Sequence, residues 1–211
     1  MAFSNIHRLI TPILRIETIG YILILISVLL IANTVRLDKT PPKPTPEEKA
    51  LFIQAENYYL GRNGCEKNVA KTLSLYEEAS KIRRHPRAVG GMGQIYLFVP
   101  GFKNIPLGIE LTEEAAKAGD YIACFRMSDF YSIEALGHAN ADKAIKYGLM
   151  ALEISPQGIR SHQALSGAYE LAGQYDKAIE HQEYIVGHYP HVNNQYHQQA
   201  KRILEEYKSH L

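Results

Sequence analysis

Apolar residues follow two different patterns along this chain. Residues 19–35 read IGYILILISVLLIANTV, an uncharged apolar run bounded by Glu17 and Arg36. From residue 47 onward, apolar residues recur instead every three or four positions, which is the spacing of amphipathic helices with one buried face. The pattern therefore predicts one transmembrane helix at 19–35, followed by an all-α domain.

The apolar run is long enough for a short membrane span, because 17 residues rise roughly 26 Å as a helix. A cleaved signal peptide is disfavoured, since the run ends without the small residues of a cleavage site. A buried core helix is disfavoured because no nearby segment offers it a partner. Residues 1–18 form a short tail, and within it residues 6–16 fit either an amphipathic helix at the membrane interface or a frayed end.

A proline-rich linker follows the predicted span at residues 36–46, where four prolines fall within TPPKPTP. Such a segment is extended and stiff, and we expect it to hold the following domain clear of the bilayer. Two basic residues precede the apolar run and four follow it by residue 49. The positive-inside rule taken literally favours a cytoplasmic domain, although a short amino-terminal tail can also stay inside as a signal anchor.

The region after the linker contains internal repeats. Asn68, Asn104 and Asn140 are 36 residues apart, and each precedes an amphipathic stretch. Asparagine is a preferred helix N-cap, so each should begin a helix. Small residues recur inside these helices, where we expect close helix packing: Thr72, Ala79, Gly108, Ala115, Ala144, Ala151 and Ala178.

A second helix precedes each capped one, and the two are separated by a glycine. In this preceding helix a tyrosine recurs with an apolar residue four positions before it, on the same face. The pairs are Ala55 with Tyr59, Met92 with Tyr96, Met127 with Tyr131 and Leu165 with Tyr169, and the glycines are Gly61, Gly101, Gly137 and Gly173. Each unit is therefore predicted to be helix, turn, helix.

These units resemble known helical repeats. Ser161–Pro190 resembles a tetratricopeptide repeat (TPR), with Leu165, Tyr169, Ala178 and Pro190 on the family spacing, and Lys103–Asp120 is similar to the longer Sel-one-like variant. The resemblance implies an α-helical solenoid of four repeats over residues 47–190 and a capping helix over 191–211. It also favours an extracytoplasmic domain on the inner membrane of a bacterial cell envelope, with the cytoplasmic side left open.

The resemblance further implies a groove that binds a protein or peptide partner, lined by the first helix of each repeat. The family's clamp for a carboxyl terminus pairs a lysine with an asparagine; here Asn57 fits, but Ile53 replaces the lysine. The expected groove residues are Ile53, Asn57, Leu60, Arg87, Gln94, Phe98, Phe125, Asp129, Arg160, Gln163 and Glu170.

Composition and motif spacing argue against other classes of function. Residues 47–211 hold 18 Lys and Arg against 20 Asp and Glu, which disfavours nucleic-acid binding. The run GGMG at residues 90–93 lacks the spacing of a phosphate loop and is interpreted as close helix packing. Cys124 falls at an apolar packing position and Cys65 in a turn; neither has metal-ligand spacing, and their oxidation state is left open.

The remaining candidates for chemistry are the histidines near the carboxyl end: His181, His188, His191 and His197. They lack the HExxH arrangement, so we interpret them as solvated surface residues. We expect no enzyme activity, cofactor, metal or small-molecule substrate. The leading hypothesis is a membrane-anchored scaffold for a partner protein; the alternatives are an immunity or inhibitor protein that occludes a toxin or effector enzyme, and a histidine-dependent metal enzyme.

Overall fold

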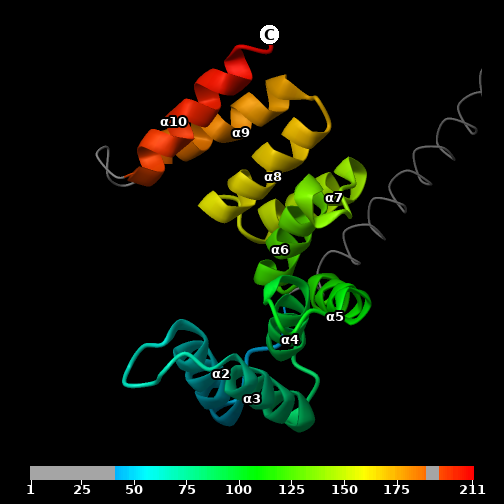
Figure 1. Ribbon diagram of the computed structural model, residues 1–211, viewed down its shortest axis with the longest axis vertical. Coiled ribbons are helices and arrows are strands. Elements are labelled where there is room, and N and C mark those ends of the chain that lie inside the picture. The colour runs from blue at the N-terminus through cyan, green and yellow to red at the C-terminus, as the bar shows by residue number, and fades with distance from the viewer. Residues whose placement is uncertain (1–40, 189–194) are drawn as a thin grey trace, which may run out of the picture. The chain divides into compact units, whose positions relative to one another are not determined.

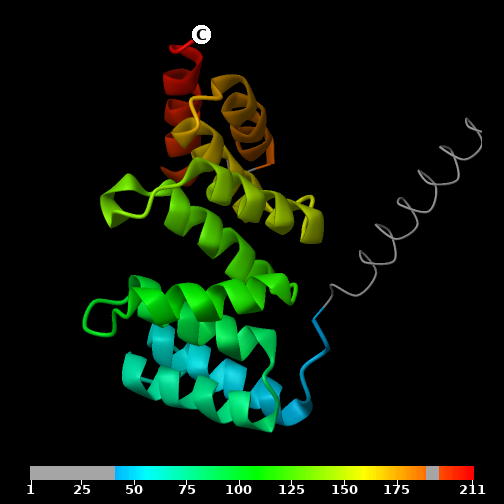
Figure 2. The same ribbon diagram turned by 90° about the vertical axis from the view of Figure 1, so that its right-hand side faces the viewer.

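In the computed structural model, which describes residues 41–188 and 195–211, the chain forms consecutive helical hairpins (Figures 1 and 2). Each hairpin pairs a first helix with a second: α2 (Pro46–Leu60) with α3 (Val69–Ile82), α4 (Pro86–Phe98) with α5 (Ile105–Lys117), α6 (Tyr121–Ser132) with α7 (Ala141–Ile154), and α8 (Ile159–Leu171) with α9 (Tyr175–His188). A short 3-10 turn, η1 (Glu134–Leu136), follows α6, and α10 (Gln195–Lys208) packs on α9.

The first helices of successive hairpins also pack on one another, α4 on α6 and α6 on α8. This arrangement confirms the predicted all-α repeat fold. It brings residues about 35 positions apart in sequence side by side, because equivalent helices of neighbouring repeats are in contact. The surface that these first helices share is the one on which the sequence predicts a binding groove.

The turn signals predicted from the repeats are present. Asn68, Asn104 and Asn140 each accept a hydrogen bond from a backbone N–H three residues later, and so cap α3, α5 and α7. The four turn glycines have positive φ angles, for example 64° at Gly61 and 68° at Gly173. Glycine adopts this left-handed conformation without the Cβ clash of other residues, so it can end the first helix and start the turn.

Small residues set the distance between helices, as predicted. Thr72, Ala79, Ala115 and Ala151 are fully buried between paired helices. Gly108 is required by its surroundings, because a Cβ there would lie 2.8 Å from the Leu97 side chain. The GGMG run also packs closely, since added Cβ atoms would lie 2.6 Å from the Tyr76 ring at Gly91 and 2.3 Å from Thr112 Oγ1 at Gly93.

The repeated tyrosines are not equivalent in the structure. Tyr131 and Tyr169 are buried as expected, whereas Tyr59 in α2 is 39% exposed. Tyr59 borders a cavity that is lined by α2, α3, α4 and α6. The apolar partner of each tyrosine is buried in all four hairpins: Ala55, Met92, Met127 and Leu165.

The end of the proline-rich linker is bound to the first repeat. His85 Nε2 lies 2.8 Å from the Pro42 carbonyl oxygen, and Arg83 Nη2 donates to the Lys43 carbonyl at 2.6 Å. Arg83 also forms two hydrogen bonds, of 2.8 and 3.0 Å, with the fully buried carboxylate of Glu48. Thr45 and Glu48 complete a capping box at the start of α2. Residues 42–45 therefore lie against the domain instead of serving as a free spacer.

None of the helices within residues 41–188 and 195–211 is long and apolar enough to cross a membrane. The predicted span at 19–35 and the tail at 1–18 lie outside the described residues, as does His191.

Candidate functional site

Two cavities open beside the first helices of the hairpins. We call them the N-terminal cavity, of about 290 Å³, and the C-terminal cavity, of about 330 Å³. The N-terminal cavity is lined by α2, α3, α4 and α6, through Glu56, Tyr59, Leu60, Arg62, Tyr76, Arg87, Gly91, Gln94, Ile95, Ile122, Phe125 and Arg126. The C-terminal cavity is lined by α8, α9 and α10, through Arg160, Gln163, Ser166, Gly167, Glu170, Gln182, Ile185, Tyr196, Gln199, Ala200, Ile203 and Tyr207.

Three arginines and one glutamate give the N-terminal cavity a net positive lining. Glu56 bridges two of these arginines, with Arg87 at 2.5 Å and Arg62 at 3.3 Å. The guanidinium of Arg126 lies 5.3 Å from the ring centre of Phe125, in cation–π geometry, and 3.6 Å from the Asp129 carboxylate. The cavity thus combines charged groups at its rim with aromatic and aliphatic walls, a mixture typical of protein-binding surfaces.

Asp129 is a half-buried carboxylate beside that arginine. Burial raises the pKa of its carboxyl group to about 6, although the charges of Arg126 and Arg160 oppose the shift. Because Arg160 belongs to α8 and Arg126 to α6, this carboxylate lies in the electrostatic field of both helices.

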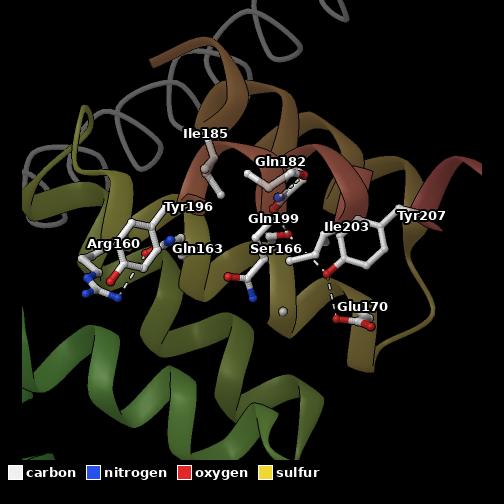
Figure 3. A pocket seen from close by; sticks show the side chains of 12 residues that line it. Arg160, Gln163, Ser166, Glu170, Gln182, Ile185, Tyr196, Gln199, Ile203 and Tyr207 are labelled. Carbon is white, nitrogen blue, oxygen red and sulfur yellow. Dashed lines mark hydrogen bonds between the residues drawn. The ribbon is translucent and has the colours of Figure 1, made fainter. Parts of the chain in front are cut away.

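The C-terminal cavity is dominated by hydrogen-bonding groups (Figure 3). The buried Ser166 hydroxyl donates to Gln182 Oε1 at 3.0 Å, and Gln182 Nε2 donates to the Ala200 carbonyl at 2.8 Å. Tyr207 Oη donates to Glu170 Oε2 at 2.7 Å. Burial raises the pKa of Tyr207, and the Glu170 carboxylate adds to the shift, so this hydroxyl remains a protonated donor. The network fixes α10 against α8 and α9.

A third, more open cavity adjoins the C-terminal one. It lies between α8 and the segment that joins α6 to η1, and it is lined by Ser132, Ile133, Glu134, Ala135, Gly167, Glu170 and Leu171. Gly167 and Glu170 line both cavities. Its charged lining residues, Glu134 and Glu170, are both acidic.

The structure gathers seven of the eleven predicted groove residues around the N-terminal and C-terminal cavities. Leu60, Arg87, Gln94 and Phe125 line the N-terminal one, and Arg160, Gln163 and Glu170 line the C-terminal one. The other four, Ile53, Asn57, Phe98 and Asp129, line neither. Asn57 instead accepts hydrogen bonds from Arg62 and Asn63 in the turn after α2, and Phe98 packs edge-on against Phe130. Phe125 is 7% exposed, so its ring forms part of the cavity wall and does not project outward to contact a partner.

Other lining residues were not predicted from the sequence. Arg62 lies in a turn, and Arg126 was not assigned to the groove although it follows Phe125 directly. The contributions of α10, such as Tyr196 and Gln199, were missed because this helix was interpreted only as a polar cap. Its place after α9 is that of the first helix of a fifth repeat, and this is the signal that could have identified it.

The interpretation of the late histidines as solvated is wrong for two of them. His181 and His197 are buried, and so is His162. His162 Nε2 lies 3.1 Å from the Pro156 carbonyl oxygen, which can only accept, so this nitrogen carries the proton. Its Nδ1 therefore accepts from the Nδ1–H of His181 at 3.0 Å. We call His162 and His181 the imidazole pair.

Aromatic rings enclose the imidazole pair on both sides. Tyr184 stacks on His162 at 3.6 Å and Tyr169 on His181 at 5.7 Å between ring centres, and His188 stacks on Tyr184 in turn. Burial lowers the pKa of both imidazoles. The charge of His188 also lowers the pKa of His162, whereas Glu180 acts in the opposite direction on both. The pair therefore links α8 to α9 in its neutral form.

Within the described residues, no group of three or more His, Cys, Asp or Glu side chains is placed to hold a metal ion. Cys124 is fully buried, as predicted, and Cys65 is partly exposed.

Comparison with known proteins supports the architecture. The chain is similar in structure to a Sel1 repeat protein from Oxalobacter formigenes, with a TM-score of 0.52 and 20% sequence identity; the match covers 77% of this chain and 73% of the other. No protein-family profile matches the sequence, and no curated protein matches it. At this level of identity the likeness shows the fold: the chain is an α-helical repeat protein of the kind seen in Sel1 repeats.

Proposed function

We propose that this chain is a non-enzymatic scaffold that is anchored in a membrane by residues 19–35 and binds a partner protein along the first helices of its repeats. The observation that carries the proposal is the pair of cavities on these helices, with charged rims and aromatic or amide-lined walls. Repeat proteins use the shared face of stacked helices to bind extended segments or helices of other proteins.

The membrane anchor is supported by the uncharged apolar run in the sequence. We place the repeat domain on the extracytoplasmic side of a bacterial inner membrane, where it would organise a partner beside the bilayer. Cys65 offers a test of this orientation, since it is partly exposed while Cys124 is fully buried. A membrane-impermeant maleimide should label intact cells that express the chain, and a Cys65→Ser variant should remain unlabelled. Labelling only after the cells are lysed would place the domain inside, and recovery of the protein in the soluble fraction would refute the anchor.

Partner binding can be tested by site-specific photocrosslinking of the full chain in cells. Photoreactive residues at Gln94 and Gln163 line the two cavities and avoid the buried core. Glu78 on α3 and Asp142 on α7 are exposed on second helices and serve as controls. We expect discrete adducts with the same partner from the cavity positions and none from the controls. Adducts from all four positions, or from none, would contradict the proposal.

A further inference from the structure

Gly167 is an unusual residue for its position, because it lies within α8 (Ile159–Leu171). A glycine inside a helix costs about 0.5–1 kcal/mol relative to alanine, so it usually has a packing reason. Five other glycines within helices have such a reason, since an added Cβ would lie 2.3–3.1 Å from another group: Gly90, Gly91, Gly93, Gly108 and Gly148. Gly187, near the end of α9, has no such contact. At Gly167 an added Cβ meets nothing within 4 Å. Packing therefore does not explain this glycine.

The place of Gly167 on the surface gives a different reason. It lines both the C-terminal cavity and the acidic cavity beside η1, so the two hollows meet across a residue that has no side chain. Any larger side chain here would extend into this open space. The missing side chain leaves the helix backbone open to close approach where the two cavities border each other, and we call these two adjoining cavities together the trough.

Charge differs between the two ends of this trough. Arg160 lies at one end of α8 and Glu170 at the other, with Gln163 and Ser166 between them (Figure 3). At the Arg160 end, the guanidinium of Arg160 is the charged group that lines the cavity. Near Glu170, the exposed Glu134 adds a second carboxylate. One end is therefore positive and the other negative, and the middle offers amide and hydroxyl groups.

We infer that this trough binds an extended peptide segment of the partner, with an acidic side chain at the Arg160 end and a basic side chain at the Glu170 end. The inference rests on the proposed function and names the chemistry of the partner. Ten residues of helix separate Arg160 from Glu170, a rise of roughly 15 Å. An extended peptide rises about 3.3 Å per residue, so the two charges should be four or five residues apart.

The polar lining of the trough suits a main chain. Amides of glutamine and hydroxyls of serine and tyrosine can donate to and accept from peptide groups, which a purely apolar groove cannot do. The buried Ser166 and Gln182 are held in place by their own hydrogen bond, so the lining is ordered before a ligand arrives. The peptide backbone would pass over Gly167, where the trough is not obstructed.

Selection of random dodecapeptides displayed on phage tests this inference with the full chain in detergent micelles. Wild-type protein should enrich peptides in which an acidic and a basic residue are four or five positions apart. Gly167→Leu should reduce the recovery of those peptides at least about tenfold, because its side chain fills the trough. Gly187→Leu is the matched control, because Gly187 is also a helical glycine with nothing within 4 Å of an added Cβ but lines neither cavity.

A charge reversal gives a readout that loss of folding cannot imitate. Arg160→Glu should enrich peptides in which a basic residue replaces the acidic one. Equal recovery by the Gly167→Leu variant, absence of the charge pair, or no enrichment at all would overturn the inference. If photocrosslinks from Gln94 persist in that case, the partner binds at the N-terminal cavity and the scaffold proposal stands. If they are also absent, both fail.

Discussion

Gly167→Ala should stabilise this protein, although it changes a residue in a proposed binding site. Alanine is favoured over glycine within a helix by about 0.5–1 kcal/mol, and the new Cβ meets nothing within 4 Å. For a domain of this size, 1 kcal/mol raises the melting temperature by about 2–4 °C. Gly93→Ala should have the opposite effect, because its Cβ would lie 2.3 Å from Thr112 Oγ1 and 2.8 Å from the Thr112 backbone nitrogen. Backbone must move there, so we expect a loss of about 1–3 kcal/mol.

The two variants can be compared by urea unfolding of the full chain in mild detergent, followed by far-ultraviolet circular dichroism. Both add one methyl group to a helical glycine, so they share the propensity gain and differ only in local space. A higher urea midpoint for Gly167→Ala and a lower one for Gly93→Ala would support the assignment of open space at the first site. If Gly167→Ala is destabilised, the trough is occupied by packing groups and the reasoning fails.

Three further predictions concern the imidazole pair, the Arg83–Glu48 ion pair and the two cysteines. Burial lowers the pKa of the imidazole pair below the unfolded value, so the pair stabilises the fold above about pH 6.5 and this stability is lost as the pH falls. His162→Leu should therefore reduce the drop in melting temperature between pH 7.5 and pH 5.5. A drop equal to that of the wild type would contradict this. Arg83→Leu leaves the Glu48 carboxylate buried without its counterion and should cost about 3 kcal/mol in urea unfolding, whereas a loss under 1 kcal/mol would show that water replaces the guanidinium. Thiol titration of the native chain should modify Cys65 rapidly and Cys124 only after denaturation; equal rates would refute the burial of Cys124.

The sequence identified the helices and their order because local chemistry dictates them. The N-cap asparagines, the glycines with positive φ and the spacing of apolar residues each act within one turn or one helix. The resemblance to known helical repeats placed seven of the eleven predicted groove residues beside the N-terminal and C-terminal cavities, but the other lining residues were not predicted. The role of Gly167 was not visible, since a glycine in a sequence does not show whether its space is filled, as at Gly93, or open.

Contacts between distant segments were decided only by the tertiary structure. His162 and His181 are buried because α8 packs on α9. In the sequence each is a polar residue, but in the fold the two form a neutral hydrogen-bonded pair. The binding of Pro42 and Lys43 to the first repeat depends on Arg83 and His85, about 40 residues away. Local preferences determine where helices begin and end, but which polar groups are buried together depends on packing that no single segment specifies.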